Sequence, residues 1–289
     1  MTSTLLRPTT SITTVAALPT DPALIDEDRR FATTYDQLQP CFVDYAGFAK
    51  TIVEISTRYR TRARMIELGC GTGLLAAEVL SAGRHVDYRG FDASVAMGEI
   101  FARRAISLER HDRGVAINAP VDLRLKASLA SALRGETAEI VLMSQFLQAI
   151  PVRVSDVLSD RAGMIEAARA AIRGNGKIVI IEEVFGESLE EHRRFAQEWD
   201  RFAIRRISDS FYDIRAALNR VDPALLDVLV ALPGRPSLVQ IVREQLWRSG
   251  EPQLLPLSSW CRLFELMRLR YRAIPHETLK NFYMFVIDA

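Results

Sequence analysis

Two separated stretches of the chain carry residues that could together bind a nucleoside. Residues 65–75 read MIELGCGTGLL, in which Gly69, Gly71 and Gly73 directly follow a short apolar run. A glycine-rich turn between a strand and a helix lets a ligand approach the main chain closely. Asp92 follows Gly73 by 19 residues and ends the segment RGFD. A carboxylate at the end of a second strand can accept hydrogen bonds from both hydroxyls of a ribose.

The spacing of the glycines discriminates between kinds of nucleotide. The dinucleotide fingerprint G-x-G-x-x-G would place its third glycine at position 74, where this chain has Leu74. The pattern here is G-x-G-x-G, so a pyrophosphate at the helix N-terminus is the poorer match. The turn therefore favours a nucleoside without phosphates. Asp92 could instead cap the next helix together with Ser94, but capping alone does not explain its distance from the glycines.

Hydrophobic periodicity predicts the elements that must position these residues. Between Asp26 and Tyr59 apolar residues recur at spacings of three and four, which is typical of helices with one apolar face. Short apolar segments then alternate with helical ones, which predicts an α/β fold with a doubly wound, mostly parallel sheet. The predicted strands are Arg64–Leu68, Asp87–Phe91, Val121–Leu125, Glu139–Met143, Lys177–Ile181, Arg270–Ile274 and Asn281–Ile287. The predicted helices among them are Leu74–Leu80, Ser94–Ile106, Asp160–Ile172 and Ser258–Met267.

The same patterns divide the chain into three parts. Residues 1–25 are rich in Ser and Thr, and we expect a disordered tail there, with a targeting segment as the alternative. Residues 26–185 and 258–289 form the α/β core, led by the N-terminal helices. Residues 186–257 lose the alternation and predict helices only. We expect these helices to form a cap over the substrate, inserted before the last two strands.

Charge and cysteine content argue against several classes of function. The net charge of +1 does not favour a nucleic acid or a membrane surface as partner, because both attract basic proteins. Cys41, Cys70 and Cys261 are far apart and show no metal-ligand spacing, and three is an odd number for a disulfide framework. A reducing, cytoplasmic location fits best. We expect no metal, and a small molecule as the partner.

The residues now carry a resemblance to a known family. Glu67 to Gly73, followed by Gly90-Phe91-Asp92-Ala93-Ser94 and Met97, resemble the class I S-adenosylmethionine (SAM) dependent methyltransferases. The resemblance implies a Rossmann-like, seven-stranded sheet whose last strand is antiparallel. It also implies SAM as the cofactor and transfer of its methyl group to a small-molecule acceptor by in-line displacement.

The resemblance further implies a set of residues that hold the cofactor. Glu67 and the glycine turn would hold its methionine end, Asp92 its ribose, and Ala93 and Met97 would flank its adenine, while Tyr35 would close over it. The implied cofactor-binding residues are Tyr35, Glu67, Gly69, Cys70, Gly71, Gly73, Asp92, Ala93, Met97, Ser128, Leu129, Ser144 and Gln145.

Two segments depart from the pattern of that family. After the third predicted strand the family often has Gly-Asp, where this chain has Lys126-Ala127, so that Ser128 or the backbone must contact the adenine. After the fourth strand the family often has Leu-His-His-Leu-Pro. Here Gln148 takes the place of the first histidine and Ala149 the place of the second.

The acceptor side is indicated by strand ends and by the predicted cap. Candidate catalytic residues are Glu183, at the end of the fifth strand, and His192, with His276 as a further histidine in a plausible position for a base. Glu183 could instead be an exposed loop acid, and a lone histidine is more often structural. The candidate substrate-binding residues are Gln148, Glu183, Trp199, Tyr212 and Arg215.

Two other functions remain open at this point. LQAIP, IEEVF and Arg215 weakly resemble carboxy-SAM synthases, which modify SAM itself and hold the new carboxylate with an arginine. A catalytically silent SAM-binding subunit is the other alternative. Its support is the absence of an acid at position 127.

Overall fold

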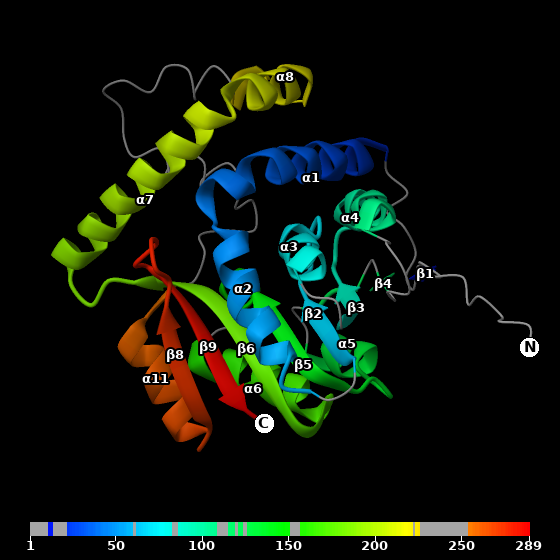
Figure 1. Ribbon diagram of the computed structural model, residues 1–289, viewed down its shortest axis with the longest axis vertical. Helices are drawn as coiled ribbons and strands as arrows, with labels where there is room; N and C mark the ends of the chain where they lie inside the picture. The colour runs from blue at the N-terminus through cyan, green and yellow to red at the C-terminus, as the bar shows by residue number, and fades with distance from the viewer. Residues whose placement is uncertain are drawn as a thin grey trace, which may run out of the picture.

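The computed structural model describes residues 11–13, 22–59, 62–82, 86–108, 115–118, 121–123, 126–150, 157–221, 223–225 and 254–289. Its centre is a twisted sheet with strand order β1-β4-β3-β2-β5-β6-β9-β8, and a short β7 pairs with β6 (Figure 1). The strands are β1 (Ser11–Thr13), β2 (Ala63–Leu68), β3 (Val86–Phe91), β4 (Val115–Asn118), β5 (Ala138–Ser144), β6 (Ile172–Phe185), β7 (Leu255–Pro256), β8 (Arg270–Pro275) and β9 (Phe282–Asp288).

The strand directions confirm the predicted doubly wound, mostly parallel sheet. Strands β4, β3, β2, β5 and β6 are parallel neighbours, whereas β9 is antiparallel to both β6 and β8. The sheet therefore has seven main strands of the predicted kind, and six of them lie where the sequence predicts them. The short strands β1 and β7 are additional.

One predicted strand was placed wrongly. The expected third strand, Val121–Leu125, lies too late in the chain: β4 is Val115–Asn118, and Val121–Leu123 lies outside any strand, while residues 124–125 are outside the described part of the chain. The alternating sequence VDLRL suggested a strand, but its described residues follow β4. This shift changes which residues lie at the carboxyl end of the strand.

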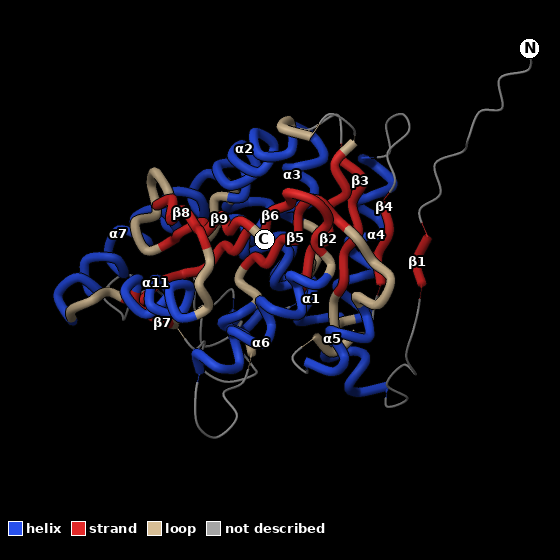
Figure 2. The backbone as a smooth tube through the Cα atoms, turned by 90° about the horizontal axis from the view of Figure 1, so that it is seen from below, coloured by secondary structure: helices blue, strands red, loops and turns tan. Residues whose placement is uncertain are grey.

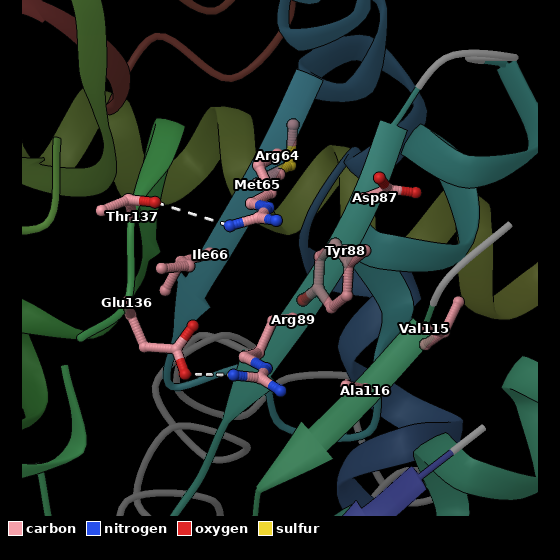
Figure 3. Close-up of a pocket in the computed structure, with 10 residues that line it drawn as sticks. All are labelled: Arg64, Met65, Ile66, Asp87, Tyr88, Arg89, Val115, Ala116, Glu136 and Thr137. Carbon is pink, nitrogen blue, oxygen red and sulfur yellow. Dashed lines mark hydrogen bonds and ion pairs between the residues drawn. The ribbon is translucent and has the colours of Figure 1, made fainter. Parts of the chain in front are cut away.

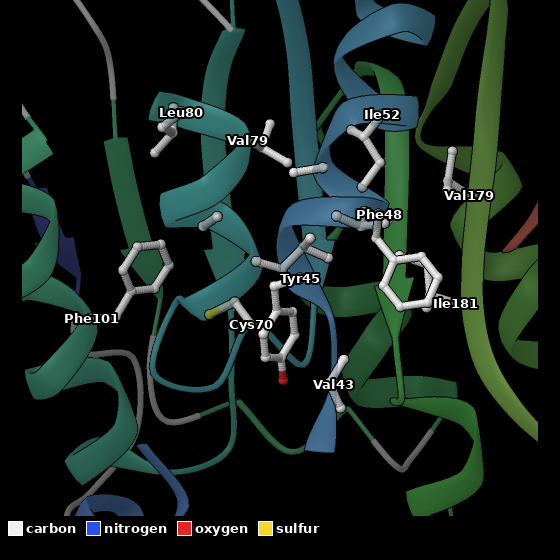
Figure 4. Packing of buried hydrophobic residues seen from close by; sticks show 14 of the residues in the cluster. Val43, Tyr45, Phe48, Ile52, Cys70, Val79, Leu80, Phe101, Val179 and Ile181 are labelled. Carbon is white, nitrogen blue, oxygen red and sulfur yellow. The ribbon is translucent and has the colours of Figure 1, made fainter. Parts of the chain in front are cut away.

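Helices cover both faces of the sheet. One face packs against α2 and α3, and the other packs against α5 and α6 (Figure 2). Figure 4 shows part of the first of these cores, to which Tyr45, Phe48 and Ile52 of α2 and Val79 and Leu80 of α3 contribute. The helices are α1 (Pro22–Phe42), α2 (Tyr45–Ser56), α3 (Leu74–Ala82), α4 (Val95–Leu108), α5 (Lys126–Ala132), α6 (Val157–Ala170), α7 (Leu189–Asp209), α8 (Phe211–Val221) and α11 (Leu257–Leu266).

Helix α1 forms a layer over the carboxyl edge of the parallel strands. It contacts α4 on one side and both α7 and α8 on the other, and Figure 1 shows α8 lying beyond it. The expected tail 1–25 overlaps β1 and the start of α1. Of the expected cap 186–257, the structure describes α7 and α8 but not residues 226–253. None of the helices in the described part of the chain combines the length and apolar character that a membrane span requires.

Candidate functional site

The glycine turn joins β2 to α3 in a conformation that glycine permits. Gly69, Gly71 and Gly73 have φ angles of +72°, +53° and +76°, in the left-handed region that other residues adopt at a cost. The backbone N–H groups of Gly69 and Cys70 donate to the carbonyl oxygen of Phe91, at 2.8 and 3.1 Å. The turn is thereby tied to the carboxyl end of β3.

The surroundings of the three glycines differ. A Cβ atom on Gly69 would approach the Phe146 ring to 2.8 Å, and one on Gly73 would overlap the Phe101 ring. A Cβ on Gly71 would lie 3.6 Å from Met97 Sδ and 3.9 Å from Tyr35 Cε1. Gly69 and Gly73 are therefore packed against aromatic rings, and Gly71 faces the space between α4 and α1.

Asp92 joins the two halves of the predicted nucleoside site. Its Oδ2 accepts a hydrogen bond from Gly71 N at 2.7 Å, and its Oδ1 accepts one from Ser94 N at 2.9 Å. Burial raises the pKa of this carboxyl, and the two backbone donors partly offset that effect. Because a carboxylate oxygen can accept two hydrogen bonds, each oxygen keeps one lone pair for a ribose hydroxyl. The helix-cap role and the ribose role are compatible.

A second buried carboxylate lies behind the turn. Glu67 is 2% exposed, and the Tyr88 hydroxyl donates a hydrogen bond to it. Burial raises the pKa of Glu67 to about 8. Hydrogen bonds link Tyr45 to Tyr35 and Gln39, and burial raises the pKa of Tyr35 to about 12. A small cavity of about 20 Å³ lies among these groups, lined by Tyr35, Tyr45, Glu67, Gly69, Cys70, Gly71, Thr72, Leu74, Leu75 and Ser144.

The cavity and its walls have the chemistry that a nucleoside with an amino-acid tail requires. The turn supplies a close backbone approach at Gly71, and Asp92 and Glu67 supply acceptors at two separate points. The cavity is far smaller than a ligand site, because α1 brings the Tyr35 ring next to Gly71, and a nucleoside could enter only if Tyr35 moved away from the turn.

Two acidic residues of helix α1, Asp28 and Asp36, bind α4 and its N-terminus and so keep α1 over the site. The Ser94 hydroxyl and the Ala96 N–H donate to Asp28, at 2.8 and 3.2 Å. Arg104 of α4 forms an ion pair with Asp36 at 2.8 Å, and it also donates to the carbonyl oxygen of Thr72. Met97 is consequently buried under α1, whereas Ala93 is exposed.

The structure does not bring Ser128 and Leu129 to this site. Both lie on α5, and Leu129 is fully buried in the core on the opposite face of the sheet. The segment after β4 approaches Asp92 instead, because Val121 N donates to the Asp92 carbonyl oxygen at 2.7 Å. The next residue, Asp122, is half-buried. Sequence reasoning missed Asp122 because the strand before it was placed too late.

The carboxyl end of β5 is unusual in its backbone. Gln145 has a φ of +52°, its N–H donates to Ile181 O at 2.7 Å, and its Oε1 accepts from Gln39 of α1 at 3.1 Å. Non-glycine residues held in this region are concentrated at functional sites. Ser144 lines the cavity, and Gln148 is buried in the following turn.

The acidic and histidine candidates on the acceptor side all have structural contacts. Glu183 is 5% exposed, and Asn281 Nδ2 lies 3.4 Å from its Oε1. The His192 ring stacks on Phe185 with 4.0 Å between centroids. His276 accepts from Leu279 N through Nδ1 at 2.9 Å, and its Nε2 lies 3.4 Å from Asp44. His276 thus joins the β8–β9 connection to the start of α2.

The candidates on the cap helices separate into core and surface. Trp199 is 7% exposed, donates from Nε1 to Phe42 O at 2.6 Å and packs edge-on against Phe282. Its contacts are those of a packing residue. Tyr212 is 83% exposed, and Arg215 is also exposed on α8. No group of three or more potential metal ligands occurs among the residues that the structure describes.

A second hollow lies away from this site, on the amino-terminal halves of β2, β3 and β4 (Figure 3). Its polar side chains already have partners within the protein. Arg89 pairs with Glu136, and Arg64 lies 3.5 Å from the Thr137 hydroxyl. In open α/β sheets ligands bind at the carboxyl ends of the strands, so we place the functional site at the glycine turn.

Comparison with solved structures identifies the fold. An O-methyltransferase family 2 protein from Planctomyces limnophilus, solved with apigenin, superposes with a TM-score of 0.56 at 14% identity over 91% of this chain and 61% of its own. The magnesium protoporphyrin IX methyltransferase of Synechocystis, solved with S-adenosylhomocysteine (SAH), gives 0.51 at 11% identity over 93% of this chain and 100% of its own. The CurJ carbon methyltransferase gives 0.50 at 13% identity over 85% of this chain and 54% of its own.

The likeness to known proteins is one of structure and not of sequence. Neither protein-family models nor curated protein sequences match the chain. The chain spans 61% of the length of the Planctomyces limnophilus protein. The chain shares three features of one architecture: the strand order, the antiparallel β9 and the glycine turn at the carboxyl end of β2. The chain therefore has the fold of the class I SAM-dependent methyltransferases.

Proposed function

We propose that this protein is a SAM-dependent methyltransferase that methylates a small-molecule acceptor. The observation that carries the proposal is the contact between Asp92 and Gly71, which joins a ribose-binding carboxylate to a glycine turn. Pyrophosphate-binding turns have a different glycine spacing. The likeness in fold to methyltransferases supports the same conclusion.

Each part of the site has a role in this proposal. SAM, when bound, supplies a methyl group on a positively charged sulfonium. Asp92 holds the ribose hydroxyls, Glu67 faces the cationic methionine end, and Met97 packs beside the adenine. Asp122, next to the segment that donates to the Asp92 carbonyl, accepts a hydrogen bond from the adenine amino group. It supplies the acid that seemed to be missing at position 127.

The acceptor enters beside Gln145, Gln148 and Glu183, beneath α1 and the cap helices α7 and α8. An in-line displacement depends mainly on positioning, and a closed site excludes competing water. The exposed position of Arg215 gives no support to the carboxy-SAM synthase alternative.

The buried carboxyl of Glu67 predicts a proton linkage. Its pKa is about 8 in the protein, so it is mostly protonated at pH 6.5. A cationic ligand favours the ionised form and lowers that pKa. We expect SAM binding at pH 6.5 to release a proton from Glu67, and affinity to rise with pH until about 8. Calorimetry in buffers of different ionisation enthalpy measures the release. Glu67→Gln should abolish this component, and an unchanged release in that variant would remove Glu67 as its source.

Binding and transfer are tested separately. Calorimetry with SAM, SAH and NAD should show binding of SAM and SAH only, and tight NAD binding would overturn the cofactor assignment. Transfer is then measured as radiolabel moved from methyl-labelled SAM to a panel of small acceptors, beginning with flavonoids. Apigenin is the first choice, since the Planctomyces limnophilus protein was solved with it. If SAM binds and no acceptor in a broad panel is labelled, the result favours the alternative of a catalytically silent SAM-binding subunit.

A further inference from the structure

A second acid at the end of β6 is enclosed more completely than Glu183. Glu182 is fully buried, and its side chain lies on the opposite face of the strand from Glu183, because successive residues of a strand alternate. That face packs against α6 and α11, as the burial of Ile180 and Val184 in the same core shows. Fully buried carboxylates are rare unless something holds them.

The partners of Glu182 come from two elements, η1 and α6. Its Oε1 accepts a hydrogen bond from Leu147 N at 2.7 Å, and Gln148 N also donates to it. Arg161 of α6, which is 1% exposed, supplies the opposing charge. The Arg161 guanidinium lies 4.9 Å from the centre of the Trp260 ring of α11. Burial raises the pKa of Glu182 to about 8 and lowers that of Arg161 to about 10, and each charge offsets the shift of the other.

The turn that Glu182 holds lies next to the candidate site. It runs from Gln145, whose φ is +52°, through Phe146 to the short helix η1 (Leu147–Ala149). Phe146 packs against Gly69 of the cofactor turn. Gln148 is 3% exposed and follows directly, on the acceptor side. A strained backbone of this kind persists only where its surroundings over-determine it.

We propose that Glu182 is a positioning residue for methyl transfer, which fixes the turn 145–149 through the N–H groups of Leu147 and Gln148. Arg161, whose guanidinium lies over the Trp260 ring, supplies the positive charge that favours the ionised form of Glu182. The turn in consequence keeps Phe146 against Gly69 and presents Gln148 to the acceptor. The effect on catalysis rests on the proposed function, whereas the effect on the turn and on Gly69 does not.

Two double variants separate the role of Glu182 as a hydrogen-bond acceptor for Leu147 N from the effect of its buried charge. Arg161→Met with Glu182→Gln keeps an oxygen for Leu147 N, and Arg161→Met with Glu182→Met removes it. Neither variant leaves an uncompensated buried charge, and apolar replacements of buried ion pairs are usually tolerated. We compare thermal unfolding, hydrogen exchange of the turn amides, and the Kd for SAH.

The Gln-containing variant should retain slow exchange at Leu147 and bind SAH within about twofold of the wild type. In the Met-containing variant exchange at Leu147 should rise at least about tenfold, and SAH affinity should fall about fivefold, at a matched unfolding temperature. Equal exchange and equal affinity in the two variants would overturn the proposal. If Glu182 and Arg161 served only to balance each other's charge, the two variants would have the same amide exchange and the same SAH affinity.

The wild-type protein provides a test that does not depend on the variants folding. The amides of Leu147 and Gln148 should exchange as slowly as those of Val141 and Leu142 in β5, and fast exchange would contradict the proposal. If the wild type fails to bind SAH while this protection is present, the proposed function fails and the positioning of the turn stands.

Discussion

Asp92→Asn is expected to weaken SAH binding by about ten- to a hundredfold while leaving the glycine turn folded. The carboxylate receives Gly71 N and Ser94 N and keeps one lone pair on each oxygen for the ribose. Asparagine retains one acceptor oxygen and replaces the other with a donor. Charged hydrogen bonds contribute about 1.5–3 kcal/mol, which corresponds to the expected loss. Calorimetric titration with SAH measures it.

Asp92→Ala is a poorer test, because it removes the acceptors of both Gly71 N and Ser94 N, whereas asparagine keeps an acceptor for one of them. It should therefore lower both the affinity and the unfolding temperature. Asp87→Asn, in the strand that precedes Asp92, is the matched control, since Asp87 is half-buried and pairs with Arg62 at 3.0 Å, away from the turn. The control should bind SAH as the wild type does. An unchanged affinity in Asp92→Asn would show that the ribose contact lies elsewhere.

Gly73→Ala is expected to lower the free energy of unfolding by about 2–5 kcal/mol. Gly73 has a φ of +76°, and an added Cβ would lie 2.5 Å from Phe101 Cγ within the core. Left-handed backbone costs a residue with a Cβ about 1–2 kcal/mol, and overpacking adds about 1–3 kcal/mol. Denaturant unfolding followed by circular dichroism measures the change.

Gly135→Ala separates the two contributions. Its φ is +80°, and an added Cβ would meet nothing within 4 Å. This variant should lose only the conformational part, about 1–2 kcal/mol. If both variants lose the same free energy, contact with Phe101 is not what excludes a side chain at Gly73. That outcome would refute the packing argument for this glycine.

Local patterns were sufficient for much of the fold. Apolar periodicity predicted the strands near β2, β3, β5, β8 and β9, and the position of Asp92 after Gly73 predicted that they meet. These features depend on neighbours in the sequence or on the shared carboxyl edge of parallel strands. The prediction of a strand at Val121–Leu125 was wrong because it used the local pattern alone. An alternating segment outside a strand resembles an edge strand until its pairing is known.

The roles of individual polar residues required the tertiary structure. Trp199 could have lined a pocket, but contact with Phe42 and Phe282 makes it a core residue. Glu182 and Glu183 are adjacent, and only the sheet decides which of them meets Leu147.

The sequence by itself determined the sheet class, the glycine turn and the acid that completes it, because short-range geometry repeats along the chain. The contacts of Gln39 with Gln145, of Asp36 with Arg104 and of Glu182 with Leu147 N join residues far apart in sequence. No local periodicity encodes such pairs. These long-range pairs form only when helices and strands pack together, because packing decides which donors and acceptors lie close to each other.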